Sequence, residues 1–148
     1  MAAYFLAQEI RRYKGKQQLP ITLFTANDGR FYPKPTLSSA LHHGKTPAQL
    51  VTASAETMAE RAPMTIETFA RVQAIDPIAK VISYSRNGAE YQHTYQRLVL
   101  ATGSEPRSLG IPGEELCDRL NSLEDYERMM PRLHTIGRIT IVGGGLVA

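Results

Sequence analysis

RITIVGGGLVA (Arg138–Ala148) is the stretch that decides the fold class, because an apolar run leads directly into three glycines. The run predicts a buried strand, and the glycine spacing matches the GxGxx(G/A) fingerprint of dinucleotide-binding turns. In this fingerprint Gly143 makes the tight turn, Gly145 lets a pyrophosphate approach, and Ala148 packs the next helix against the strand. The same residues also fit a glycine-rich turn that binds no ligand.

A second stretch of the same kind, RLVLATGSEP (Arg97–Pro106), lies upstream of the first. Its continuous apolar residues Leu98–Ala101 predict a strand buried on both faces, as the strands of parallel sheets are. Ala101, Thr102 and Gly103 follow as a turn of small residues. The combination of the two strand-and-glycine stretches favours an α/β protein with a parallel sheet.

The middle of the chain changes to strand-type patterns. The runs ARVQAID, KVISYS and AEYQHTY follow one another, separated by Asp76-Pro77 and Asn87-Gly88. Asn-Gly between two strand patterns is the strongest short-range signal for a hairpin. The sequence therefore predicts a small antiparallel β-meander over Arg71–Tyr95.

Helical patterns lie on both sides of the meander. The segment SLEDYERMM opens with Ser122, and Asp125 follows three residues later, which is a loose capping pattern for a helix. ITLFTA (Ile21–Ala26) is typical of a short buried strand. Further helices are predicted at Leu37–Leu41, at Ser54–Arg61 and near the start of the chain, where Ala3, Leu6, Ala7, Ile10 and Tyr13 form an apolar face.

Composition and charge narrow the class of protein. The 148 residues are 43% hydrophobic and 21% charged, which suits one domain with a core and is too apolar for a disordered chain. The net charge is +5 over residues 1–50, 0 over residues 51–100 and −2 over residues 101–148. This mild gradient lacks the concentrated basic face of nucleic-acid binders, so we predict no nucleic-acid partner.

Cysteine usage and hydropathy bear on metals and compartment. Cys117 is the only cysteine, which excludes an internal disulfide framework, a CxxC pair and a cysteine zinc cluster. His42 and His43 are adjacent and point apart on a helix, so we predict no metal site. No run approaches the ~20 apolar residues that span a bilayer, and the first residues lack the order of a signal peptide. These features predict a soluble, cytoplasmic protein without a membrane span.

Three segments together resemble the FAD-dependent reductases of the pyridine nucleotide-disulfide type, which have two dinucleotide-binding domains, and most closely their rubredoxin reductase branch. ITLFTANDGRFYPKPTLSSAL resembles the second strand and flavin loop of that branch, whose Tyr-x-Lys/Arg-Pro-x-Leu-Ser core stands here at residues 32–38. RLVLATGSEPRSLGIPGEE resembles its ATG segment, and ITIVGGGLVA resembles the start of its NAD-binding domain. The intervening lengths also agree, so the resemblance covers nearly the whole chain.

The resemblance implies an incomplete α/β fold of the FAD/NAD(P)-binding, Rossmann-like, three-layer type with an antiparallel β-meander insertion. Residues 1–137 would form a partial FAD-binding domain, and residues 138–148 the first strand and turn of an NAD(P)-binding domain. Met1, Ala2 and Ala3 match the tail of the family's first FAD fingerprint, GxGMAA, whose strand and GxG turn are not in this sequence. We therefore expect a fragment of a larger reductase, truncated at both ends and inactive alone.

The resemblance also implies roles for single residues. The acidic group that binds the adenosine ribose falls at Asn27, with Asp28 as a substitute, although Asp28 equally fits a turn residue before Gly29. Lys34 is the catalytic candidate, because it matches the cation facing the isoalloxazine, where it would stabilise the anionic reduced flavin; the alternative is a solvated loop lysine. Val72 matches the residue whose backbone binds adenine, or is a plain strand valine. The implied cofactor-binding residues are Asn27, Asp28, Lys34, Pro35, Val72, Ala101, Thr102, Gly103, Gly143 and Gly145.

The function that the resemblance implies belongs to the parent protein. It would take electrons from NADH or NADPH onto FAD and pass them singly to rubredoxin or a similar small iron-centred carrier. The alternative is a non-catalytic remnant, or a partner-binding fragment, that holds no flavin. The absorbance spectrum of the purified protein separates these two hypotheses.

Overall fold

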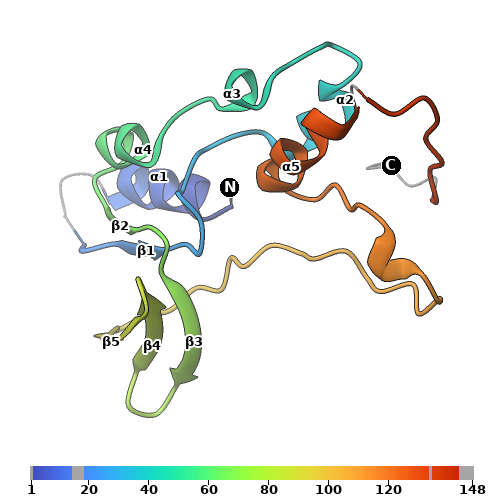
Figure 1. Ribbon diagram of the computed structural model, residues 1–148. Coiled ribbons are helices and arrows are strands. Elements are labelled where there is room, and N and C mark those ends of the chain that lie inside the picture. The colour runs from blue at the N-terminus through green and yellow to red at the C-terminus, as the bar shows by residue number, and fades with distance from the viewer. Residues whose placement is uncertain (1, 15–18, 134, 144–148) are drawn as a thin grey trace. The chain divides into compact units, whose positions relative to one another are not determined.

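The chain folds as two compact units, each of which is described by itself. The computed structural model describes residues 2–14, 19–133 and 135–143. Unit 1 comprises Met1–Phe31 and Ala53–Thr102, and unit 2 comprises Tyr32–Thr52 and Gly103–Ala148. Figure 1 shows the order of the helices and strands along the chain.

Unit 1 contains a parallel pair of strands, and a helix precedes each of them. Leu23 on the first strand lies opposite Ile66 on the second. The second helix begins after Ser54, whose hydroxyl accepts a hydrogen bond from the Thr57 N–H. The strand predicted within Ile21–Ala26 is confirmed, because the first strand of this pair lies inside that range. In chain order the elements are α1 (Ala2–Lys14), β1 (Thr22–Phe24), α4 (Ala55–Arg61) and β2 (Thr65–Glu67).

Within unit 1, helix α1 buries a narrower face than the sequence predicts. Tyr4 is buried, whereas Leu6 and Tyr13, expected on the apolar face, are exposed. Tyr4 sets this orientation, because its hydroxyl donates a hydrogen bond to the Gly29 carbonyl (2.6 Å) and its ring meets Phe31 edge-on at 5.9 Å. One core cluster of unit 1 contains Tyr4, Ala53 and Met58, with Leu23, Phe31, Met64 and Ile66 packed against it.

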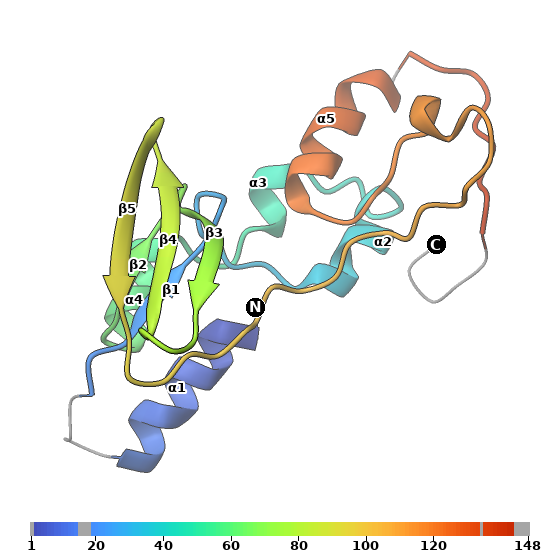
Figure 2. The same cartoon turned by 90° about the horizontal axis from the view of Figure 1, so that it is seen from below.

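The predicted antiparallel meander is confirmed. Strands β3 (Arg71–Asp76), β4 (Val81–Arg86) and β5 (Ala89–Thr94) form one sheet in the order β3-β4-β5, as Figure 2 shows. Asn87 and Gly88 form the turn between β4 and β5, and both have positive φ angles, 52° and 79°. Positive φ at both central residues is what a tight two-residue hairpin turn requires, which explains the Asn-Gly pair.

Aromatic and ionic contacts hold the meander against the parallel pair. The ring of Phe24 on β1 lies 4.9 Å from that of Tyr84 and 5.2 Å from that of His93. Arg86 on β4 forms an ion pair with Glu67 on β2 at 2.5 Å. Because Phe24 and Glu67 are the last residues of β1 and β2, these contacts fix the meander at the carboxyl ends of the two parallel strands.

Unit 2 is built from short helical segments and one longer helix. Thr46 and Gln49 exchange hydrogen bonds in a capping box that opens one of the short helices. The Tyr126 hydroxyl on the long helix donates to the Lys45 carbonyl (2.8 Å). The buried core residues are Leu37, Ala40, Leu50, Leu123 and Tyr126. The elements are η1 (Lys34–Thr36), α2 (Leu37–Ala40), α3 (Pro47–Leu50), η2 (Glu114–Leu116) and α5 (Leu123–Leu133).

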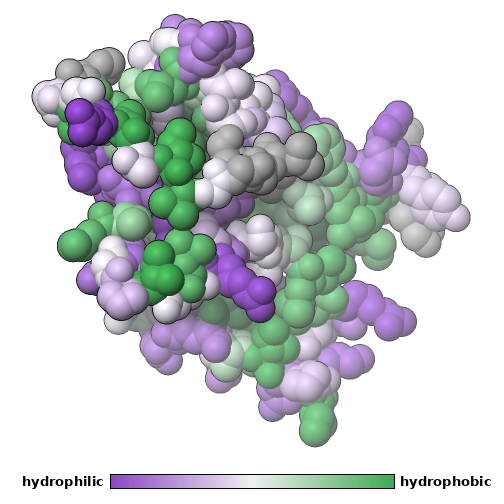
Figure 3. Space-filling view, turned by 90° about the vertical axis from the view of Figure 1, so that its right-hand side faces the viewer, coloured by the Kyte–Doolittle hydropathy of each residue, from purple (hydrophilic) through white to green (hydrophobic). Residues whose placement is uncertain are grey.

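Two predicted strands are wrong in the described structure. Leu98–Ala101 and Ile139–Val142 pair with no strand among the described residues and are not strands themselves. A parallel strand needs a hydrogen-bonded neighbour, so an apolar run alone cannot form one. Val99 and Leu100 are 62% and 69% exposed, and Figure 3 shows apolar side chains (green) at the surface. The α/β class is confirmed, and the predicted domain boundary at residue 137 stays a prediction.

Leu100→Glu is expected to reduce aggregation of the 148-residue polypeptide. Leu100 is exposed, so a charge there interrupts the apolar run and changes the free energy of unfolding by less than about 0.5 kcal/mol. Light scattering as a function of protein concentration measures the effect. Gln96→Glu is the matched control, because it adds the same charge at an exposed residue outside the run. If both variants aggregate equally, the exposed apolar run at Leu98–Ala101 does not drive the aggregation.

Candidate functional site

The turn after β1 places Asn27 at the carboxyl end of a parallel strand. The ladder continues past β1, where the Thr25 N–H donates to the Glu67 carbonyl (3.0 Å). The Asn27 side-chain oxygen then accepts hydrogen bonds from the Thr25 hydroxyl (2.7 Å) and the Gly29 N–H (3.1 Å). Ligands of open α/β sheets bind at the carboxyl ends of strands, so the fold favours a ligand at this turn.

Asp28, the next residue of the turn, is held by a neighbouring arginine. One of its carboxylate oxygens accepts a hydrogen bond from the Arg30 N–H (3.1 Å), and the other pairs with the Arg30 guanidinium at 2.5 Å. This arrangement is the turn role that the sequence allowed for Asp28. The arginine also offsets part of the negative charge that Asp28 could offer to a ribose hydroxyl. The roles of Asn27 and Asp28 toward ribose stay predictions.

Tyr4, which the sequence did not single out for the site, fixes the same turn through its hydrogen bond to the Gly29 carbonyl. Burial raises the pKa of the Tyr4 hydroxyl, and the negative charges of Asp28 and Glu56 raise it further. The hydroxyl therefore stays protonated at neutral pH and remains a donor. Gly29 is suited to this position because its φ is +74°, in the left-handed region that favours glycine.

The segment between β2 and β3 is hydrogen bonded to this turn. The Phe69 N–H donates to the Asn27 carbonyl (2.9 Å), and the Ala70 N–H donates to the Thr25 carbonyl (2.8 Å). These bonds bring the start of β3, with Val72, to the Asn27 turn. Among the described strands β3 pairs only with β4, and a bulge follows Val72, so backbone N–H and C=O groups on its other edge are open to a ligand.

Lys34 and Pro35 lie in unit 2, on a loop anchored by Tyr32. The Tyr32 hydroxyl accepts a hydrogen bond from the Leu123 N–H at the first turn of α5 (3.0 Å). Lys34 is half-buried, and its ammonium group has no hydrogen-bond or ion-pair partner within the part of the chain that the structure describes. A cation of this kind can neutralise an anionic group on a ligand, which is the chemistry predicted for Lys34.

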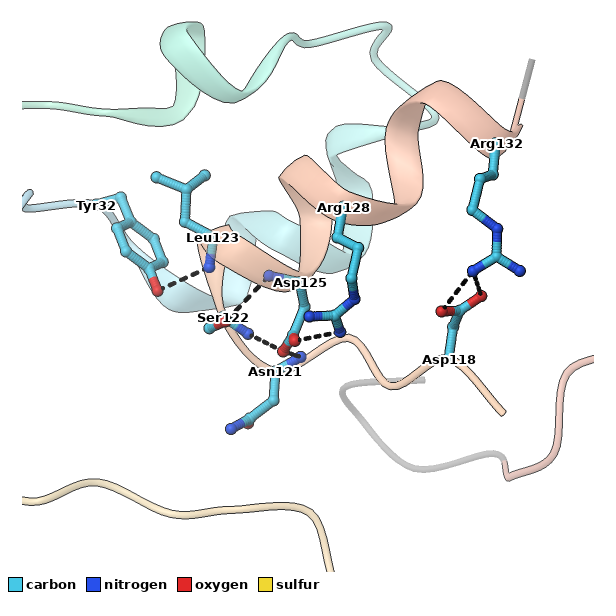
Figure 4. Close-up of polar contacts among 8 residues, drawn as sticks. All are labelled: Tyr32, Asp118, Asn121, Ser122, Leu123, Asp125, Arg128 and Arg132. Atoms are coloured by element: carbon cyan, nitrogen blue, oxygen red, sulfur yellow. Dashed lines mark hydrogen bonds and ion pairs between the residues drawn. The ribbon is translucent and has the colours of Figure 1, made fainter. Parts of the chain in front are cut away.

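The N-terminus of α5, to which this loop is anchored, is capped as the sequence predicts (Figure 4). An Asp125 carboxylate oxygen accepts hydrogen bonds from the Asn121 and Ser122 N–H groups (3.0 and 2.9 Å), and the Ser122 hydroxyl accepts one from the Asp125 N–H (3.1 Å). Burial acts to raise the pKa of Asp125, but hydrogen bonds from the Asn121 backbone and from Arg128 help to lower it overall. The charged carboxylate therefore caps the helix at neutral pH.

Asp125→Asn is expected to remove an acid-dependent part of the stability of unit 2. Because the pKa of Asp125 is lower in the folded protein, its contribution is complete above its ordinary value of 3.8 and is lost as the pH falls through the folded pKa. At neutral pH the loss of the cap should cost about 1 kcal/mol. Urea unfolding at several acidic pH values should give a shallower pH dependence for Asp125→Asn. Ser122→Ala is the control, since it weakens the cap and keeps most of that dependence.

The other predicted cofactor residues lie in exposed connections. Ala101 and Thr102 in unit 1 and Gly103 in unit 2 are exposed. Gly103 has a φ of +76° and Gly143 one of +115°, and no atom lies within 4 Å of the place of a Cβ at either glycine. Both backbones are thus open to a ligand, while the roles of these residues stay predictions. The predicted residues that lie outside the described part are Met1, Gly145 and Ala148.

The described side chains include no group of three or more His, Cys, Asp or Glu residues that could hold a metal ion. The rings of His42 and His43 meet edge-on at 5.0 Å. In residues 2–14, 19–133 and 135–143, no helix has the length and apolar character needed to cross a bilayer.

The parallel pair with a turn at its carboxyl end and the antiparallel meander, together with the glycine-rich sequence after Val142, fit an α/β protein of the dinucleotide-binding class. The chain belongs to the pyridine nucleotide-disulphide oxidoreductase family, whose sequence profile matches residues 1–148.

Two relatives match nearly the whole chain and are themselves longer than it. It is 36% identical to the rubredoxin-NAD(+) reductase of Acinetobacter baylyi over an alignment 151 residues long, gaps included. The alignment covers 99% of this chain and 38% of that protein. It is also 36% identical to the nitric oxide reductase FlRd-NAD(+) reductase of Klebsiella pneumoniae over 146 residues, which cover 99% of this chain and 37% of that protein. The chain therefore spans less than two fifths of the length of these relatives.

Solved structures establish the fold. The NADH:rubredoxin oxidoreductase from Clostridium acetobutylicum matches with a TM-score of 0.72 at 19% identity, covering 97% of this chain and 36% of that chain. Reduced CoADR-RHD from Bacillus anthracis matches with a TM-score of 0.77 at 20% identity, covering 90% of this chain and 24% of that chain. Both likenesses extend over most of the 148 residues.

Proposed function

We propose that this chain forms the FAD-binding part of a reductase that takes electrons from NADH or NADPH and passes them to a small iron-centred carrier such as rubredoxin. One observation carries the proposal: in unit 1 the Asn27–Asp28 turn, at the carboxyl end of β1, is hydrogen bonded to the segment that leads into the open edge of β3. An α/β sheet favours a nucleotide at such a place. The names of the two relatives support an NAD-linked reaction and a rubredoxin-type partner.

The chemistry of the described residues fits FAD. Asn27 and Asp28 offer an amide and a carboxylate to ribose hydroxyls, and the backbone around Val72 offers N–H and C=O groups to a base. Gly103 permits a close approach to the backbone, because nothing occupies the place of a Cβ. When bound, FAD supplies the chemistry that links a two-electron donor to a one-electron acceptor.

Lys34 contributes through its charge in this proposal. No carboxylate in the described part of the chain cancels that charge, so the ammonium group can favour an anionic form of the ring. We therefore assign Lys34 to the catalytic site, with Pro35 supporting the loop that carries it. We assign Ala101, Thr102 and Gly103 to the path of the FAD dinucleotide, and Gly143 and Gly145 to the pyrophosphate of NAD(P)H.

The protein at its full natural length provides the test. We expect it to purify yellow, with about one flavin per chain. NADH or NADPH should bleach the flavin absorbance, and oxidised rubredoxin should restore it. A colourless protein that takes up no added FAD would overturn the proposal and favour a non-catalytic or partner-binding fragment. A flavin that is reduced but not reoxidised by rubredoxin would overturn the choice of partner alone.

A further inference from the structure

Phe69 has a backbone conformation that is unusual for its side chain. Its φ is +53°, in the left-handed region, where bulky residues are genuine outliers. The other non-glycine residues with positive φ in the described chain are Lys80 and Asn87, which lie in the two hairpin turns of the meander. Phe69 instead lies in the connection between β2 and β3. Such strain persists only where the surroundings enforce it, and it concentrates at functional sites.

The surroundings of Phe69 do enforce this conformation. Its N–H donates to the Asn27 carbonyl (2.9 Å). After it in the sequence, the Ala70 N–H donates to the Thr25 carbonyl, and before it the Glu67 carbonyl accepts from the Thr25 N–H. The methyl group of Thr68 also lies 3.4 Å from the place of a Cβ on Gly29. The strained residue is therefore fastened to the turn that the proposed FAD site uses.

Although its backbone is held by these hydrogen bonds, Phe69 is exposed to solvent. Its side chain is 59% exposed, and it makes no ring contact with another aromatic residue in the described part of unit 1. An exposed phenyl ring gains nothing from burial, so core packing does not explain why a phenylalanine stands at a position that favours glycine or asparagine. A flat apolar partner for the ring would explain it.

We propose that the ring of Phe69 is the stacking platform for the adenine base of the bound nucleotide. The inference rests on the proposed FAD site and adds a residue that recognises the base. Bases stack on aromatic side chains through their flat faces, whereas backbone groups recognise their edges. Phe69 would cover the face of the adenine, the open edge of β3 at Val72 would meet its edge, and Asn27 would face the ribose.

The test compares Phe69→Asn with Phe69→Tyr in the full-length protein. Asparagine adopts positive φ readily and lacks an aromatic ring, whereas tyrosine keeps the ring. We expect Phe69→Asn to weaken the binding of both FAD and AMP about tenfold, and Phe69→Tyr to change it by less than about twofold. Isothermal titration of the flavin-free protein with FAD and with AMP measures both effects. The flavin-free Phe69→Asn protein should also unfold at a higher temperature, because the strain is relieved.

Opposite changes in stability and affinity separate stacking from a structural role. Lys80→Asn is the matched control, since it relieves a similar φ of +55° in the β3–β4 turn and should leave both affinities unchanged. Phe69→Leu keeps the apolar bulk without the ring and should weaken binding as Phe69→Asn does. If the wild-type protein binds FAD and the Phe69→Asn protein binds FAD and AMP equally well, the platform is overturned and the proposed function stands. If the wild-type protein binds no FAD, both proposals fail.

Discussion

Lys34→Met in the full-length protein is expected to slow the reduction of bound FAD by NADH on the order of tenfold to a hundredfold, with a smaller effect on FAD affinity. Methionine keeps the length and apolar stem of lysine and removes the charge. Because the ammonium group lacks an ionic partner in the described structure, its loss should raise the free energy of an anionic ring directly. A tenfold change in the equilibrium constant for reduction of the flavin corresponds to about 30 mV in its two-electron midpoint potential. Stopped-flow reduction and a redox titration measure the two quantities.

The controls for Lys34 use the other lysine of unit 2 and a charge-preserving change. Lys45→Met removes a cation from an exposed residue of unit 2 and should leave the rate of reduction and the potential unchanged. Lys34→Arg keeps the charge and should recover most of the wild-type potential. An unchanged potential and an unchanged rate in Lys34→Met would show that Lys34 is a solvated loop lysine.

The elements that the sequence predicts well have local determinants. Asn87 and Gly88 readily adopt the positive φ that a two-residue turn requires at both positions, so the hairpin can be predicted from this dipeptide. The Ser122 hydroxyl accepts a hydrogen bond from the Asp125 N–H, and the Asp125 carboxylate accepts one from the Ser122 N–H, so this part of the α5 cap lies within one helix turn. Such features need no knowledge of distant segments, and the structure confirms them.

The errors have a non-local cause. The patterns of Leu98–Ala101 and Ile139–Val142 indicate residues suited to a buried parallel strand, but pairing depends on a neighbour far away in sequence. No described segment provides one, so both runs are exposed. The prediction of the buried face of α1 is wrong for a related reason. A hydrogen bond from the Tyr4 hydroxyl to the carbonyl of Gly29, which is distant in sequence, decides which residues of α1 are buried.

The candidate site is predictable only where a motif names its residues. Asn27, Asp28 and Lys34 stand in a segment whose pattern resembles a known flavin loop, which is why they are candidates. Phe69 carries no such signal, because phenylalanine rarely adopts positive φ and nothing beside it in the sequence announces that conformation. In the structure the hydrogen bond from the Phe69 N–H to the Asn27 carbonyl connects this residue to the candidate site.

Gly29→Ala is expected to destabilise unit 1 by about 2–5 kcal/mol, as measured by urea unfolding. A Cβ at a φ of +74° costs roughly 1–2 kcal/mol in backbone strain. It would also lie 3.1 Å from the Ala55 Cβ and 3.1 Å from the Tyr4 hydroxyl. Neither neighbour can move easily, because Ala55 is the first residue of α4 and the hydroxyl is held by the Gly29 carbonyl. Crowding should therefore add to the strain.

Gly88→Ala separates these two contributions. Gly88 has a similar φ of +79°, but nothing lies within 4 Å of the place of its Cβ, so this variant carries the backbone strain without the crowding. The excess destabilisation of Gly29→Ala over Gly88→Ala then measures the packing around Gly29. Adding Tyr4→Phe to Gly29→Ala removes the crowded hydroxyl, so the double variant should lose less than the two single variants combined. Equal effects at Gly29 and Gly88, or strict additivity with Tyr4→Phe, would contradict close packing of this turn against α1 and α4.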